Sequence, residues 1–141
     1  MKRKIEFTVL GEPQGKGRPK FARRGKYVSV RTPEKTKAYE NAIQAAYLQQ
    51  CDNVRFPEGC QLELRVTAYF KIPKSAGKKK REIMLLGEVR PTKKPDGDNI
   101  LKAVADVLNS VAYKDDACVV DAQIRKFYSD IPRIEVILQQ G

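Results

Sequence analysis

The sequence predicts a small single domain of the α+β class. Segments in which apolar and polar residues alternate are typical of half-buried strands, and they occur near both ends and in the middle of the 141-residue chain. Segments rich in helix formers lie between them, and no linker, repeat or low-complexity tract divides the chain. One domain of this length can bury a substantial core, so we expect residues 1–141 to fold as one unit.

The first half of the chain contains one clear strand and one clear helix. Residues 5–9 alternate in polarity and predict the strand, and residues 11–26 read as a loop rich in Gly, Pro and basic residues. Thr32 and Pro33 form a good N-cap and first-turn pair, and residues 38–50 are strong helix formers throughout.

The second half contains the remaining strands. Residues 62–70 alternate cleanly and predict a second strand, whereas residues 75–86 favour a short basic helix that Gly87 stops. Residues 119–128 and 133–138 predict two further strands, with apolar residues enough to supply an interface edge.

A helix over residues 98–110 separates a core face from a polar face. Asp98 is its expected N-cap or first residue, and Asp98, Lys102 and Asp106 fall on one side at helical spacing. The apolar stripe on the other side comprises Leu101, Val104, Leu108 and Val111, with Ile100 and Val107 beside it. Core packing and chemistry would therefore use different faces of this helix.

Charge makes nucleic acid the leading candidate partner. The chain has 28 Lys and Arg against 17 Asp and Glu, a formal net charge of +11. A membrane surface is the competing partner, but no 18-residue apolar run occurs, and the segment after the basic start Met1–Lys4 is too short and polar for a signal peptide. We therefore expect a cytoplasmic protein without a membrane partner.

The chain has no histidine and only three cysteines, none in C-x-x-C spacing. Catalytic triads, histidine bases and ordinary zinc sites are thereby excluded. Any chemistry is left to carboxylates, lysine, tyrosine or a metal-bound water.

The aspartates near the helix start are candidate ligands for Mg²⁺. Asp96 and Asp98 flank Gly97 where a loop enters the helix, and Asp116 could approach from the far side of the same helix or from the adjoining strand. Mg²⁺ takes oxygen ligands, and a few carboxylates plus substrate phosphates suffice. The alternative is structural: Asp-Gly is a common turn, Asp98 an ordinary N-cap, and Asp115-Asp116 a solvated loop.

Each of the candidate lysine and arginine side chains has a functional and a structural interpretation. Lys102 lies one turn beyond Asp98 and could contact a scissile phosphate, or it could pair with Asp98 or Asp106, and we expect Asp106 to be a structural partner. The loop that begins at Gly11 does not have the residue spacing of a P-loop. It is better interpreted as a basic arm that contacts the nucleic-acid backbone. The candidate DNA contacts, which could equally be solvated, are Lys16, Arg18, Lys20, Arg23, Lys79 and Lys80.

Taken together, these segments resemble one family. The run KKPDGDNILKA at residues 93–103, then DVLN at 106–109 and YKDD at 113–116, resembles the signature of the RusA family of Holliday junction resolvases, and PQGKGRP at 13–19 resembles its N-terminal segment. The resemblance implies an α+β homodimer, with a mixed sheet packed by two main helices, that uses Mg²⁺ to nick four-way DNA junctions symmetrically. By matched position, Asp96, Asp98 and Asp116 would be the metal-binding catalytic carboxylates and Lys102 the essential lysine.

One position departs from the family pattern. Gly97 stands where the family usually has an aliphatic residue. A glycine removes a packing anchor, so we expect the aspartate pair to be held less firmly.

The sequence therefore predicts a metal-dependent endodeoxyribonuclease acting in DNA recombination and repair. The runner-up is a non-catalytic, structure-selective DNA-binding protein. An RNA-binding module has less support, because no RRM or KH signature is present. Two matched nicks across a four-way junction require two sites, which favours a C2 dimer.

Overall fold

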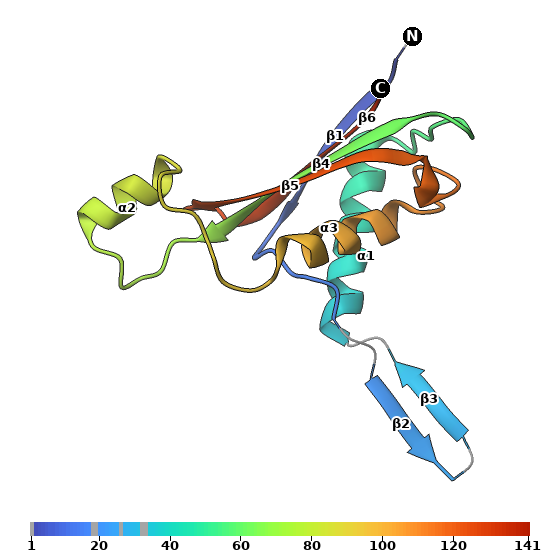
Figure 1. The fold of residues 1–141 in the computed structure, drawn as a ribbon, viewed down its shortest axis with the longest axis horizontal. Helices are drawn as coiled ribbons and strands as arrows, with labels where there is room; N and C mark the ends of the chain where they lie inside the picture. Colours follow the sequence, from blue (N-terminus) through green and yellow to red (C-terminus); the bar gives the residue numbers. More distant parts are fainter. Residues whose placement is uncertain (1, 18–19, 26, 32–33) are drawn as a thin grey trace.

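The computed structural model describes residues 2–17, 20–25, 27–31 and 34–141, and its main body is a four-stranded mixed sheet with helices packed against it (Figure 1). The strand order is β1-β6-β4-β5, with β6 antiparallel to both its neighbours and β4 parallel to β5. The strands are β1 (Lys4–Leu10), β4 (Leu62–Lys71), β5 (Val119–Ser129) and β6 (Arg133–Gln140). The predicted α+β class is confirmed. Of the two strands expected to supply an interface edge, β5 lies at an edge and β6 in the interior of the sheet.

Two main helices, α1 (Glu34–Cys51) and α3 (Gly97–Leu108), cover one face of this sheet. Helix α1 packs on β1 and on α3, and α3 packs on β5. The third helix, α2 (Lys78–Leu85), lies beyond one end of the sheet and contacts β5 (Figure 1). It begins three residues later than the sequence predicts, because Gly77 adopts an extended N-cap conformation.

The core forms between the sheet and these two helices. Along β4, every second residue from Leu62 to Phe70 is buried, as the alternation predicts. Helix α3 buries Ile100, Ala103, Val104 and Leu108, which recur at helical spacing. The predicted stripe is therefore rotated slightly, since Leu101 is only half-buried and Val111 lies past the helix end.

The opposite face of the sheet carries aromatic and cationic side chains. The Tyr69 and Phe127 rings stack with centroids 6.0 Å apart, across the β4 and β5 register. The Arg133 guanidinium lies 4.0 Å from the Tyr69 centroid, and that of Arg90 lies 4.2 Å from the Phe127 centroid. Cation–π attraction of this kind holds the arginines flat against the sheet.

The loop predicted over residues 11–26 is wrong in its second half. Residues Lys20–Arg24 form β2, which pairs antiparallel with β3 (Tyr27–Arg31) in a separate two-stranded sheet. Figure 1 shows this hairpin projecting beyond the start of α1. Its basic residues interrupt the alternation that marks a strand, and pairing with β3 supplies the backbone hydrogen bonds instead. The predicted N-cap pair Thr32-Pro33 lies outside the described residues.

In the described ranges, no helix has both the length and the apolar character that a membrane crossing requires.

Candidate active site

The start of α3 presents two aspartates that no described residue engages. Asp96 is the N-cap, with φ −66° and ψ 148°, and its side chain makes no capping hydrogen bond. Asp98 is the second residue of the helix rather than the predicted N-cap, and its side chain is exposed. The structural alternative, in which Asp98 caps the helix, is therefore wrong. Two carboxylates are left facing solvent at the positive end of a helix dipole.

Gly97 brings this pair close to the sheet. A Cβ at Gly97 would lie 3.2 Å from Cγ2 and 3.3 Å from Cγ1 of Ile124 on β5. Contacts that short require the Ile124 side chain to give way by a few tenths of an ångström. The glycine thus lets the first turn of α3 rest directly on β5. The looser hold on the aspartate pair that the glycine predicts stays a prediction, and the structure adds that the glycine permits this close packing.

The third candidate carboxylate lies at the other end of the helix, in a different environment. Asp115 accepts a hydrogen bond from the Ala117 N–H at 3.1 Å and so caps the short 3₁₀ turn Asp116–Cys118. Hydrogen bonding with Asp115, followed by burial, the Asp115 charge and the Asp106 charge, raises the pKa of Asp116. An acidic neighbourhood of this kind attracts cations.

The aspartates that could hold a metal ion are Asp96 and Asp98 at the start of α3. Among the described residues, no three His, Cys, Asp or Glu side chains converge closely enough to hold a metal. Asp116 is therefore not gathered with Asp96 and Asp98 into a preformed set of three. Because Mg²⁺ keeps several waters and needs only one or two protein carboxylates beside substrate phosphates, Asp96 and Asp98 fit it chemically.

Lys102 is exposed one turn beyond Asp98. The structural alternative for this lysine was an ion pair with Asp98 or Asp106. Neither residue forms an ion pair with Lys102, and Asp106 pairs with Lys16. The Lys102 ammonium is left to face solvent on the same side of the helix as Asp98.

Lys16 is committed within the fold. Its Nζ lies 2.7 Å from Asp106 Oδ2 and 3.5 Å from Glu40 Oε2. The hydrogen bond to Asp106 is the main reason that the pKa of Lys16 is raised. The structural partner predicted for Asp106 is therefore Lys16. A DNA phosphate at the contact predicted for Lys16 would have to compete with two carboxylates for its ammonium group.

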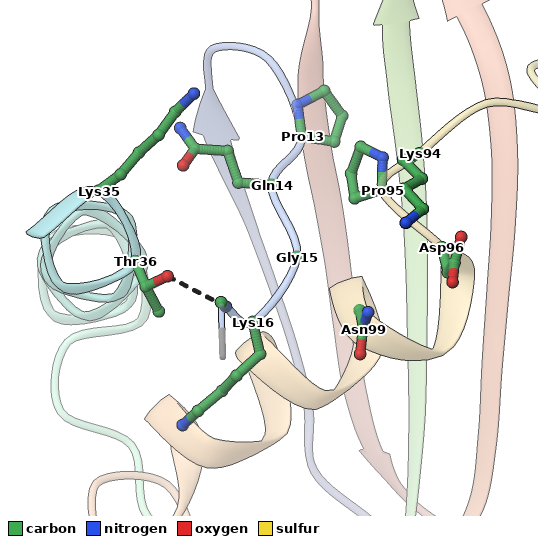
Figure 2. A pocket seen from close by; sticks show the side chains of 11 residues that line it. Pro13, Gln14, Gly15, Lys16, Lys35, Thr36, Lys94, Pro95, Asp96 and Asn99 are labelled. Atoms are coloured by element: carbon green, nitrogen blue, oxygen red, sulfur yellow. Dashed lines mark hydrogen bonds between the residues drawn. The ribbon is translucent and has the colours of Figure 1, made fainter. Parts of the chain in front are cut away.

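The segment Pro13–Gly17 crosses the start of α3 and forms one wall of a cleft of about 730 Å³ (Figure 2). The Lys16 N–H donates to the Asn99 carbonyl at 3.2 Å, and the Gly17 N–H donates to Thr36 Oγ1 at 3.0 Å. The segment therefore ties α3 to the first turn of α1. Asp96 and Asn99 line the opposite wall. The sequence analysis assigns no role to Gln14 or Asn99, and the available signal was that each lies within a motif that resembles the RusA family.

The other predicted DNA contacts are distributed widely. Lys79 and Lys80 are exposed on α2, whereas the neighbouring Arg81 forms an ion pair with Asp130. Lys20 and Arg23 lie on β2 with side chains outside the described part of the chain, and Arg18 lies wholly outside it. Figure 1 places α2 and the β2–β3 hairpin at different ends of the molecule, so they form no single patch within one chain.

The buried tyrosines are unsuited to proton transfer. Burial raises the pKa of Tyr39 and of Tyr47 to about 12 and moves that of Tyr113 in the same direction. Each hydroxyl stays protonated near neutral pH. Among the groups that the sequence leaves available, the exposed carboxylates of Asp96 and Asp98 and the exposed Lys102 lie together on the first turns of α3.

A basic α+β domain with unengaged aspartates at a helix start has the features of a nuclease. Comparison with known families agrees: the model of the family described as Endodeoxyribonuclease RusA matches residues 11–139. The chain belongs to the RusA family of endodeoxyribonucleases, as its motifs predict. It is also similar to "Uncharacterized protein YqaN" of Bacillus subtilis (strain 168), with 40% identity over 138 residues that cover 96% of each chain.

Proposed function

We propose that this protein is a Mg²⁺-dependent endodeoxyribonuclease that resolves four-way DNA junctions by paired symmetric nicks, in recombination and repair. The observation that carries the proposal is the pair of unengaged carboxylates of Asp96 and Asp98 at the start of α3, in a member of the RusA family. The side chain of a purely structural aspartate at this place would be expected to accept a hydrogen bond from a free backbone N–H of the first turn, or to pair with a lysine.

The residues divide the work between them. Asp96 and Asp98 would hold the metal, with Asp116 contributing from the far end of the helix as the family resemblance implies. A bound Mg²⁺ would activate a water and stabilise charge on the leaving oxygen. Lys102, on the Asp98 side of α3, would hold a phosphate oxygen and offset the charge that develops there.

The net charge of +11 supports a polyanionic substrate. The exposed cations Lys79 and Lys80 on α2 would contact one DNA arm, and the hairpin with Lys20 and Arg23, together with Arg18, another. Lys16 would act mainly as an anchor for the segment that crosses α3, since Asp106 and Glu40 already hold its ammonium.

Pairing of two chains would complete the activity. A four-way junction has two-fold related strands, and one carboxylate site per chain gives one nick per chain. A C2 homodimer would supply the second. Light scattering should report a dimer, and time courses should show both nicks within the lifetime of one complex, with ligatable linear duplexes as products. A monomer that nicks one strand at random would contradict the resolvase assignment.

The direct test is incubation with a labelled synthetic four-way junction, with and without Mg²⁺, beside a linear duplex of the same sequence. We expect junction cleavage only with the metal and little cleavage of the duplex. Tight binding without cleavage in Mg²⁺ would instead identify a non-catalytic, structure-selective DNA-binding protein.

A further inference from the structure

The cleft between the Pro13–Gly17 segment, α1 and α3 extends away from the aspartate pair, and of that pair only Asp96 lines it (Figure 2). We infer that this cleft binds one unstacked nucleotide of the cleaved strand, next to the phosphodiester at the aspartates, and reads its base. The inference rests on the proposed function, because it places the cut strand at Asp96 and Asp98.

The size of the cleft suits a ligand as large as a nucleotide. Its volume of about 730 Å³ falls within the range of roughly 300 to 1,000 Å³ that is typical of sites for ligands of this size. A base that leaves its stack can enter a site of this kind, as in other proteins that act on an unstacked nucleotide.

The wall formed by Pro13–Gly17 is held in place before any ligand arrives. Lys16 is anchored to Asp106 through its side chain and to Asn99 through its backbone, and Gly17 is anchored to Thr36. Gly15 packs so tightly that a Cβ there would lie 2.9 Å from Asn99 Cβ. A wall fixed at this many points gives a preorganised site, which loses little entropy on binding.

The lining has the chemistry that base recognition requires. Gln14 and Asn99 carry carboxamides, which donate and accept hydrogen bonds at once and match the edges of bases. The Pro13 and Pro95 rings add apolar surface for the face of a base. Neither carboxamide hydrogen-bonds to another side chain in the part of the chain that the structure describes.

Two lysines place the sugar-phosphate backbone. Lys35 on α1 and Lys94 before α3 are both exposed and line the cleft. Lys16 also lines it, but its charge is balanced by Asp106 and Glu40. A strand running from the cleft to Asp96 would therefore meet cations at the rim and carboxylates only at the point of cleavage, where a divalent ion is expected to bind.

The first arm of the test uses 2-aminopurine, whose fluorescence rises when it leaves a base stack. The probe is placed at each position flanking the cut in one strand of a four-way junction, with a chelator present to keep the DNA intact. We expect wild-type protein to raise the fluorescence at one position beside the cut and at none within the arms. Gln14→Ala should reduce that rise.

The second arm compares cleavage rates of junctions that differ only in the base at that position. Wild-type protein should prefer one base, and Gln14→Ala should lower the preference by about tenfold, the value of one good amide contact. Gln49→Ala, which removes an exposed amide near the other end of α1, is the matched control and should keep the preference. Equal melting temperatures of the two variants would exclude unfolding as the cause.

The outcomes separate the two proposals. Junctions that are neither bound nor cut would overturn the proposed function itself. Junctions that are bound and cut, with no position brightening and with the same base preference in Gln14→Ala as in wild type, would overturn the nucleotide site alone.

Discussion

The two ends of helix α3 carry aspartates in opposite circumstances. At its start, Asp96 and Asp98 are exposed and engage no described residue. Toward its C-terminal end, Asp106 holds Lys16 at 2.7 Å, and beyond that end Asp115 caps a 3₁₀ turn through the Ala117 N–H. The residue type is the same at both ends, and only the neighbours differ.

This contrast separates functional from structural charge in the fold. A carboxylate with an internal partner contributes to stability, although a partly exposed pair is worth only about 1 kcal/mol. A carboxylate without a partner contributes little to stability and remains available for an external cation. Substitution of Asp96 or Asp98 should therefore change activity, whereas substitution within the Lys16–Asp106 pair should change stability. Asp116, beyond the C-terminal end, should follow the first pattern, because the family resemblance implies that it is a catalytic carboxylate.

The largest effect should come from Asp98→Asn. This change keeps the shape of the side chain and removes its charge, so junction binding and the melting temperature should persist while nicking falls by about a thousandfold or more. Asp96→Asn and Asp116→Asn should behave likewise, whereas Asp106→Asn should be mild in activity. Gel assays of binding and cleavage check this, and normal nicking by Asp98→Asn would sink the assignment of the site.

Lys102 lies between the two ends of α3, and its substitution tests how far along the helix the active site extends. Lys102→Met should leave the melting temperature unchanged, because the lysine has no ion pair with Asp98 or Asp106, and should lower the single-turnover rate by about a hundredfold. Lys37→Met, an exposed lysine on α1, is the control. Equal rates for the two variants would assign Lys102 to the solvated surface.

At the C-terminal end, Lys16→Met should act on stability. Both partners of the Lys16–Asp106 pair are about one third exposed, at 30% and 31%, so the free energy of unfolding should fall by about 1 kcal/mol, or about 3 °C in melting temperature. Lys16→Arg should recover part of it. Calorimetry of Lys16→Met, Asp106→Asn and the double variant should reveal a coupling energy, and strict additivity would contradict the pairing.

The same pair predicts a pH dependence. Asp106 raises the pKa of Lys16 above its ordinary value of 10.5, so the stabilisation is complete below that value and is lost only as the pH rises through the higher folded pKa. The difference in melting temperature between wild type and Lys16→Met should therefore be constant from pH 7 to 9 and should shrink in stronger alkali. A difference that already shrinks between pH 7 and 9 would point to another group.

The smallest effect is expected from substitutions in helix α2, which carries no candidate metal ligand, and it should appear in the salt dependence of DNA affinity. Replacing Lys79 and Lys80 by Ala should leave the fold intact and flatten the dependence of log affinity on log salt, by about 0.9 for each DNA phosphate that the lysines neutralise in wild type. Fluorescence anisotropy over a salt series measures the slope. An unchanged slope would show that these lysines do not contact DNA phosphates.

Periodicity predicted most of the fold, because the burial of each element follows from the order of its own residues. The alternation over residues 62–70 predicted β4, and the spacing of the apolar residues after Asp98 predicted α3 to within a few residues. The β2–β3 hairpin escaped prediction, because the basic residues of β2 leave no clear alternation and pairing between the two strands supplies the backbone hydrogen bonds. The start of α2 escaped for a similar reason, since backbone geometry at Gly77 sets it.

Composition and motifs alone established the available chemistry: a cationic chain without histidine, with aspartates at a helix start, in the RusA family. Which of those charges are engaged depended on the folded chain. Folding joined Lys16 to Asp106 across 90 residues of chain, set Gly97 against Ile124, and opened a cleft beside Asp96. A side chain's type is local, whereas its partners are brought to it by packing that depends on residues far along the chain.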